Sequence, residues 1–424
     1  MRTPQTASEL TPFTRWSIVS LLAAVLFLTY VDRGAVPTAA HHIQDELALS
    51  PQQLGVLFSA FFWSYSVLQI PVGWFAERYG AQRVLAGGLA LWACATMLVG
   101  FAHSFAVLLL LRLLLGIGES AGFPCVSKLL AATVPVESLG LANGIVAFAY
   151  QFGPAVGAYC GGMIMVHYGW RATFWIFGGL SLLWLIPWSG VRLPRESTRE
   201  RAPEAPPLGD ILRQPSLWGT ALGLFSTNYV FYFVLSWLPL YVVRERGFST
   251  AEMATLTGSA YLVSALTSII AGWAIDRFVR AGHATIAYKS VMVVAHIGTV
   301  LCMLSIAFGS QPWAIAGIFS YQVITGAASA GVFAIPQILA GSAASARWVG
   351  IQNCCGNFAG VIATWLTGQL VGQTHHFTAA FVTAAVVSLS GLIGWVWMVP
   401  RVAPLRWASL AANADQPALA QARQ

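Results

Sequence analysis

The stretch Gly73-Trp-Phe-Ala-Glu-Arg-Tyr-Gly80 closes a long apolar run, and a shorter copy of it, Gly272-Trp-Ala-Ile-Asp-Arg277, closes another run in the second half of the chain. Each copy places glycine, tryptophan and an acid–arginine pair at the end of an expected membrane span. A unit that recurs at equivalent places is typical of a transporter built from two similar halves. The repeat therefore predicts a chain made of two helical halves.

The composition excludes a water-soluble globular protein. Of the 424 residues, 57% are hydrophobic and only 9% are charged, and the mean hydropathy is +0.69. About a quarter of the residues in a soluble domain are charged, so these charges are too few to cover a surface in water. Continuous apolar runs such as 21–30 also exclude a membrane β-barrel, whose strands alternate in short segments.

Apolar segments of about 20 residues, the length that crosses a bilayer, recur along the whole chain. Their expected bounds are 16–36, 54–75, 83–103, 105–127, 139–166, 171–190, 216–243, 252–276, 287–308, 312–340, 347–372 and 377–399. The expected fold class is an all-α membrane protein with twelve transmembrane helices in two six-helix halves. The halves are expected over residues 1–191 and 216–424, joined by a cytoplasmic linker, 192–215, whose prolines discourage helix.

Lysine and arginine residues set the expected orientation, because loops rich in them stay on the cytoplasmic side. With the N-terminus inside, only Arg171, Arg244 and Arg246 fall in external loops. Both termini and the linker are therefore expected in the cytoplasm, and the multi-pass chain in the inner (plasma) membrane. The net charge of +7 then reflects topology rather than a nucleic-acid site, and a monomer is expected.

Four charged residues are expected inside the membrane, all in the first half: Asp32 and Arg33 in span 1, Arg112 and Glu119 in span 4. Charge at the bilayer centre is costly and usually serves function, although ion pairs that only hold helices together are the alternative. Arg112 and Glu119 are seven residues apart and share a helix face. Helix rise places Asp32 and Arg112 at similar depths, which predicts an Asp32–Arg112 ion pair. Arginine offers a planar fork to a carboxylate and a desolvated carboxylate takes up a proton, so the group suits an anion and a proton together.

The second half offers neutral polar groups in place of charges. They lie in spans 7 and 11 and are Asn228, Tyr229, Tyr232, Gln352, Asn353, Asn357, Thr364 and Thr367. Asn353 and Asn357 are four residues apart and share a face. This division predicts a hydroxylated anion held by charge on one side and by hydrogen bonds on the other. Hydrogen bonding between helices is the alternative for each residue.

No cofactor, metal or catalytic residue is predicted. Gly153, Gly157 and Gly161 have the spacing of a helix-packing face rather than a phosphate loop. His296 is interpreted as a packing residue, with proton handling as the alternative. Four other histidines fall in expected external loops, too far from an acid cluster for a metal site: His41, His42, His375 and His376.

The segment Gly73–Arg83 resembles the loop signature of the major facilitator superfamily, with Glu77 where Asp is usual and Gln82 where a basic residue is usual. Within the superfamily, three motifs resemble the anion:cation symporter family: Asp32-Arg33, the run Arg112–Pro124, and Gly350-x-x-Asn353-x-x-x-Asn357-x-x-Gly360. That family includes bacterial galactonate, hexuronate and glucarate permeases and animal sialic acid and vesicular glutamate carriers. The resemblance covers essentially the whole chain and implies the major facilitator fold.

The resemblance also implies roles for single residues. Arg33 would contact the substrate carboxylate, Asp32 and Glu119 would take up protons, and Arg112 would couple them. Tyr65 and Gln151 match substrate-site positions of the family, which adds to a set of expected substrate contacts that also includes Tyr229, Tyr232, Asn353 and Asn357. The expected gating residues at the cytoplasmic helix ends are Gly73, Glu77, Arg78, Gly80, Arg83, Asp276 and Arg277.

The expected function is proton-coupled symport of a small organic anion, a sugar acid or related carboxylate, by alternating access. Protonation of Glu119 and Asp32 is expected to weaken the Asp32–Arg112 pair and admit the anion to Arg33. An anion exchanger or facilitator without proton coupling and a transporter-like sensor are the alternatives. Thr364 stands where many relatives have proline, and Trp365 is bulky, so the identity of the anion stays open.

Overall fold

Helices make up nearly all of the computed structural model, which describes residues 11–134, 136–191, 206–405 and 407. The helices of the first half are α1 (Pro12–Thr38), α2 (Ala40–Leu47), α3 (Pro51–Tyr79), α4 (Ala81–Val99), α5 (Phe105–Glu119), α6 (Gly122–Thr133), α7 (Val136–Tyr168), α8 (Trp170–Leu183) and α9 (Leu185–Ser189). Those of the second half are α10 (Leu208–Leu212), α11 (Pro215–Arg244), α12 (Thr250–Arg280), α13 (Ala284–Phe308), α14 (Gln311–Thr374), α15 (Thr378–Leu392) and the π-helix η2 (Ile393–Met398).

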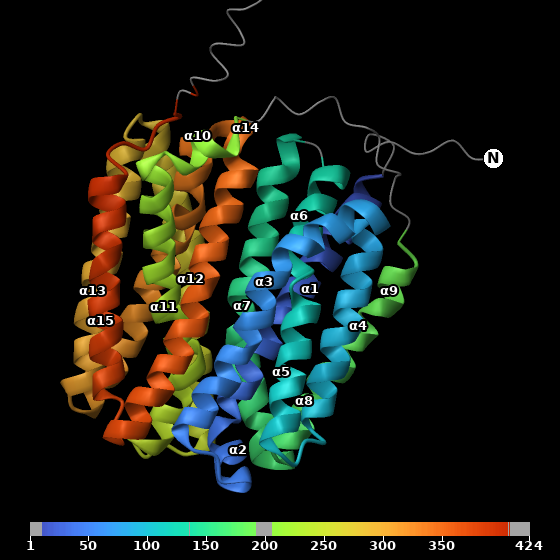
Figure 1. The fold of residues 1–424 in the computed structure, drawn as a ribbon, viewed down its shortest axis with the longest axis vertical. Helices are drawn as coiled ribbons and strands as arrows, with labels where there is room; N and C mark the ends of the chain where they lie inside the picture. Colours follow the sequence, from blue (N-terminus) through green and yellow to red (C-terminus); the bar gives the residue numbers. More distant parts are fainter. Residues whose placement is uncertain (1–10, 135, 192–205, 406, 408–424) are drawn as a thin grey trace, which may run out of the picture.

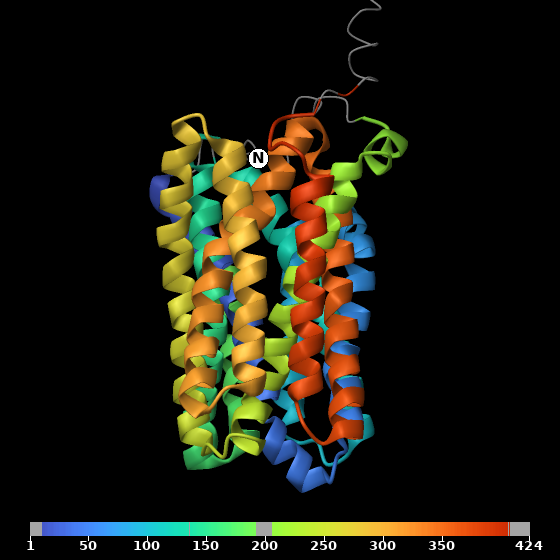
Figure 2. The ribbon, with the colours of Figure 1, turned by 90° about the vertical axis from the view of Figure 1, so that its left-hand side faces the viewer.

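The helices of the two halves form two bundles that lie side by side (Figure 1). In the view turned by 90°, the long helices again run roughly along one common direction (Figure 2). One end of the molecule carries α2, and the opposite end carries α10 (Figure 1). We call these the α2 end and the linker end.

Nine helical spans in the described part of the chain are long and apolar enough to cross a bilayer. Three further long segments accompany them: α3, α7 and the part of α14 that follows Gly341. Together they are the twelve spans that the sequence predicts. Large apolar side chains on the outer helices are exposed, such as Leu301 on α13 (63%) and Val386 on α15 (61%), as expected of a surface that faces lipid.

Several helix boundaries differ from those expected, and three of them show a physical reason. The span expected over 105–127 is broken, because Pro124 cannot donate to the carbonyl of Ser120 and its ring crowds that carbonyl, so α5 ends at Glu119 and α6 begins at Gly122. The spans expected over 312–340 and 347–372 are joined through a kink at Gly341, whose φ is 66°. The linker was expected to lack helix, but it contains α10, which begins directly after Pro207, because proline is tolerated at a helix start.

Matching N-terminal caps begin the second long helix of each half. At α3, Ser50 Oγ accepts from Gln53 N at 3.2 Å and Gln53 Oε1 accepts from Ser50 N at 2.9 Å. At α12, Ser249 and Glu252 make the same reciprocal bonds at 3.2 and 2.8 Å. Each capping box satisfies backbone N–H groups that the helix leaves free, so the internal repeat extends to how these helices start.

The two bundles are in close contact near the α2 end. A Cβ atom added at Gly55 of α3 would lie 3.0 Å from the Cα of Gly368 of α14, so the two backbones touch with no side chain between them. At the same end, His41 Nε2 of α2 lies 2.9 Å from Thr250 Oγ1 of α12. His41 was expected in a loop and instead belongs to a helix that bridges the halves. These contacts close the α2 end.

Candidate functional site

The helix that carries the first pair of deep charges is held in place by glycines of α7. A Cβ atom at Gly153 would lie 2.6 Å from Tyr30 Cβ, and one at Gly157 would lie 2.6 Å from Val31 O. The packing role predicted for these glycines is confirmed. Such close approach leaves α1 little freedom to rotate, and Arg33 shares a helix face with Tyr30.

Arg33 is buried in an ion pair and surrounded by aromatic rings. Its Nε atom lies 2.7 Å from Glu119 Oε2, and the two side chains are 3% and 0% exposed. Its guanidinium carbon lies 4.7, 4.9 and 4.4 Å from the ring centres of Tyr30, Phe61 and Tyr65. Both terminal amino groups of Arg33 lack a hydrogen-bond partner among the described residues. The guanidinium thus retains a free fork for a second anion.

The second deep arginine lies against the same aromatic residue. Arg112 Cζ is 5.3 Å from the ring centre of Phe61, and Arg112 Nε donates to Leu57 O at 3.4 Å. Its Nη1 atom has no partner within the described ranges. Two guanidiniums and one paired carboxylate, Glu119, therefore leave this part of the site with a surplus of positive charge, which favours an anionic ligand.

Asp32 lies apart from these groups, and the predicted Asp32–Arg112 ion pair is wrong. Thr96 Oγ1 of α4 donates to Asp32 Oδ2 at 3.5 Å, and Trp92 and Ser181 face the same carboxylate. Asp32 is 2% exposed, and its Oδ1 atom has no partner in the described structure. The carboxylate is thus enclosed between α1, α4 and α8.

The error has a simple geometric cause. Consecutive residues of a helix point about 100° apart, so Asp32 and Arg33 cannot both face α5. The helix rise predicts the depth of a residue but not which neighbour it faces. Arg33 takes the α5 side, where it pairs with Glu119, and Asp32 is turned to α4.

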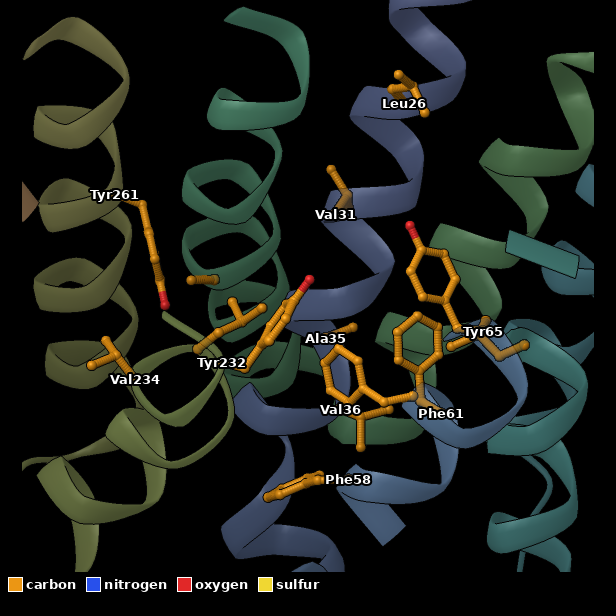
Figure 3. Close-up of a cluster of buried hydrophobic side chains, with 14 of the residues drawn as sticks. Leu26, Val31, Ala35, Val36, Phe58, Phe61, Tyr65, Tyr232, Val234 and Tyr261 are labelled. Carbon is orange, nitrogen blue, oxygen red and sulfur yellow. The ribbon is translucent and has the colours of Figure 1, made fainter. Parts of the chain in front are cut away.

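The second half contributes a tyrosine and an asparagine to the same centre. Tyr232 Oη of α11 donates to Asn357 Oδ1 of α14 at 2.8 Å, and the ring of Tyr232 lies 4.4 Å from that of Phe62. In Figure 3, Tyr232 approaches α1 from the second half, while Phe61 and Tyr65 approach it from α3. Five of the predicted site residues thus meet at the centre: Arg33, Tyr65, Glu119, Tyr232 and Asn357.

The other predicted substrate contacts have no hydrogen-bond partner in the part of the chain that is described. Gln151 and Asn353 are half-buried and Tyr229 is buried. Asn353 lies one helical turn closer to the linker end than Asn357. By contrast, Gln352 Nε2 donates to Val332 O at 3.2 Å, which is the helix-packing alternative.

The predicted gating residues are at the linker end. Arg78 and Arg277 lie in the last turns of α3 and α12. Gly80, with φ at 88°, joins α3 to α4, and Arg83 N donates to Gly80 O at 3.2 Å. The surroundings of the remaining gating positions lie outside what the structure describes: Gly73, Glu77 and Asp276.

Sequence reasoning missed the aromatic walls of the site. Tyr30 precedes Arg33 by three residues, and Phe61 precedes Tyr65 by four. Residues at these spacings share a helix face, so the spacing to a predicted site residue could have identified Tyr30 and Phe61 as site residues. His296 Nδ1 lies 3.2 Å from Ser388 Oγ, in agreement with its interpretation as a packing residue. No cluster of metal ligands occurs in the part of the chain that the structure describes.

The profile of the Major Facilitator Superfamily matches residues 22–364 of the chain. The chain belongs to this superfamily. It is therefore a multi-pass membrane transporter and not an enzyme. The resemblance that the motifs predicted is confirmed.

Two curated relatives and one solved structure are similar to the chain over most of its length. The hexuronate transporter of Bacillus subtilis is 29% identical, covering 86% of this chain and 91% of the relative. The probable sulfoacetate transporter SauU of Cupriavidus necator is 27% identical, covering 91% and 94%. A bacterial homologue of the human lysosomal transporter Spinster has a TM-score of 0.73 at 18% identity, covering 96% and 98%, which shows the shared fold.

Proposed function

We propose that this transporter carries a small organic anion, a sugar acid or related carboxylate, into the cell together with protons. The observation that carries the proposal is the buried Arg33–Glu119 ion pair, in which two amino groups of the guanidinium have no partner in the described structure. A carboxylate can accept from both in a bidentate geometry. The names of the two relatives, hexuronate and sulfoacetate transporters, support an organic anion as the cargo.

Glu119 and the substrate compete for one cation, and this competition couples the proton to the anion. While Glu119 is ionised it neutralises Arg33, and an incoming anion meets a carboxylate. Protonation of Glu119 leaves Arg33 as a buried charge without a counterion, which is strongly unfavourable. An anion that binds Arg33 removes that cost. Proton and anion therefore bind more tightly together than alone, a coupling that acts in both directions.

The other deep charges would support this exchange. Arg112 adds positive charge beside Phe61 and so favours the anion. Asp32, enclosed near Thr96, would be a second protonation site that does not touch the substrate. Tyr65, Gln151, Tyr229, Tyr232, Asn353 and Asn357 would line the substrate path.

Transport would follow from opposite motions at the two ends. The halves, residues 1–191 and 216–424 with 192–215 between them, would rock about the central site, so that the closed α2 end opens when the linker end closes. The gating residues at the linker end would form the second closure. We further propose that the linker end and both termini face the cytoplasm, that the protein resides in the inner membrane, and that it works as a monomer.

Reconstituted liposomes test the proposal directly. Wild-type protein should accumulate a radiolabelled hexuronate against its gradient when the outside is acidic. Glu119→Gln, which keeps the shape but cannot be ionised, should equilibrate the substrate without accumulating it. Glu252→Gln, at an exposed helix cap, is the matched control. Accumulation by Glu119→Gln would refute the coupling, and pH-independent counterflow by wild type would identify an exchanger.

A further inference from the structure

Two polar side chains of the second half are buried without a partner. Gln322 of α14 is 1% exposed, and Tyr261 of α12 is 4% exposed. Neither the amide oxygen nor the amide nitrogen of Gln322 has a hydrogen-bond partner in the described structure, and neither does the Tyr261 hydroxyl. Such groups are unfavourable in a protein interior unless something binds them. In the same bundle the amide nitrogen of Gln352 donates to two backbone carbonyls, although its amide oxygen has no partner in the described structure.

The two groups lie at one depth. Thr250, at the start of α12, contacts His41 of α2. Gly309, just before α14, accepts a hydrogen bond at 3.0 Å from Arg246, just after α11. Both α12 and α14 therefore begin at the α2 end. Tyr261 and Gln322 each lie eleven residues after the first residue of their helix, about 17 Å along it.

Gln322 faces α12. Its neighbour Tyr321 lines a cavity of about 20 Å³ with His296 of α13, and the next residue of a helix points about 100° away. Four residues further on, a Cβ atom at Gly326 would lie 3.1 Å from Thr267 Cβ of α12. The amide of Gln322 is therefore on the face of α14 that packs against α12, level with Tyr261.

Tyr261 faces the central site. It belongs to the same buried cluster as Phe61, Tyr65 and Tyr232, and Figure 3 shows its side chain extending from α12 to the side where Tyr232 lies. Tyr65 and Glu119 are each fourteen residues from the start of helices that begin at the α2 end, about 21 Å along them. The unpartnered groups of the second half and the ion pair of the first half are therefore at similar depths.

We propose that Tyr261 and Gln322 hydrogen-bond the neutral, hydroxyl-bearing end of the carried anion, remote from the carboxylate that Arg33 holds. An amide and a phenol each donate and accept hydrogen bonds, as sugar hydroxyls do, and neither attracts a second charge. The inference rests on the proposed function and narrows its substrate to polyhydroxylated carboxylates. A short anion such as sulfoacetate could reach Arg33 but would leave both groups unsatisfied.

Transport of two anions by the full-length protein in liposomes tests the inference. The probes are a hexuronate and sulfoacetate, and the variants are Gln322→Leu and Tyr261→Phe. The KM for the hexuronate should rise at least tenfold in each variant, because a site built to bond a hydroxyl loses that contact. The KM for sulfoacetate should stay within twofold if it is carried, and the melting temperature of the ligand-free variants should be unchanged or higher.

Tyr241→Phe is the matched control, because the Tyr241 hydroxyl donates to Ile306 O at 2.8 Å and accepts from Arg246. It should lower the melting temperature and leave the hexuronate KM unchanged. An unchanged hexuronate KM in Gln322→Leu and Tyr261→Phe, or an equal rise for both anions, would overturn the inference. Wild type that carries sulfoacetate but no hexuronate would also overturn it and leave the proposed function intact. Wild type that carries no organic anion would refute the proposed function itself.

Discussion

Arg33 Nε and Glu119 Oε2 lie 2.7 Å apart with both side chains buried, and this pair joins α1 to α5 across a gap of 86 residues in the chain. Removal of one partner from a buried ion pair leaves the other as a buried charge without a counterion, which is strongly destabilising. The same contact therefore has a structural and a functional consequence. It holds two helices together, and any event that neutralises Glu119 makes Arg33 available to another anion.

The structural consequence predicts how the pair responds to mutation. Arg33→Ala leaves Glu119 as a buried charge without a counterion and should destabilise the ligand-free protein by about 3–5 kcal/mol. Adding Glu119→Gln removes that charge and should recover most of the loss, although substrate binding stays abolished. Thermal unfolding in detergent measures both effects. A double variant no more stable than Arg33→Ala would show that the two side chains are not coupled.

A second mutational cycle tests the separation of Asp32 from Arg112. Because Thr96 rather than Arg112 contacts Asp32, the effects of Asp32→Asn and Arg112→Gln on stability should add to within about 0.5 kcal/mol, as for sites that share no contact. The same thermal unfolding measurement applies, with the Arg33–Glu119 cycle as its positive control. A coupling as large as that of Arg33 with Glu119 would restore the ion pair that the sequence predicted.

These two cycles mark the boundary between what sequence predicts here and what it does not. Apolar length and the positions of charges predicted the helices and the four deep residues, because both depend on neighbours along the chain. The partner of Arg33 depends on how α1 is rotated against α5. That rotation is set by contacts distant in sequence, such as Gly153 against Tyr30, and no local pattern contains it.

Neutral polar residues show the same limit. Gln322 and Gln352 both belong to largely apolar stretches of α14, and the composition of these stretches does not show that their roles differ. The amide nitrogen of Gln352 donates to two backbone carbonyls, whereas neither amide atom of Gln322 has a partner in the described structure. Only their surroundings, which come from other helices, distinguish a packing residue from a candidate ligand contact.

The contact between Gly55 and Gly368 predicts that a larger side chain will open the α2 end. Gly55→Val adds atoms where a Cβ already lies 3.0 Å from Gly368 Cα and Thr364 O, and overpacking of this kind costs about 1–3 kcal/mol. Hydrogen–deuterium exchange in the peptide around Gly368 should rise, and uptake should fall about tenfold. Gly87→Ala is the control, since a Cβ there has nothing within 4 Å and should change neither. Normal uptake by Gly55→Val would mean that the halves need not approach so closely.

The histidines of α2 predict that the α2 end opens in acid. Burial, with the neighbouring His42, lowers the pKa of His41 to about 4, and burial also lowers the pKa of His42. Arg244 adds positive charge nearby, while Asp45 opposes it. Once the end opens and His41 meets water, its pKa should return to about 6.5. The closed end thus binds fewer protons than the open one, so closure is fully favoured above about pH 6.5 and weakens as the pH falls towards 4.

Distance measurements between spin labels on the two halves can follow this opening. Tyr168 at the end of α7 and Trp313 at the start of α14 are 75% and 67% exposed, and labels there should move apart between pH 7.5 and pH 5. His41→Gln retains a group that can hydrogen-bond Thr250 but cannot be protonated near neutral pH, so its distances should change far less. The shift in population is at most about tenfold per pH unit for each histidine that titrates. If His41→Gln opened as readily as wild type, the proton that opens this end would bind elsewhere, and His42, whose Nε2 lies 3.5 Å from Thr250 Oγ1, would be the next residue to replace.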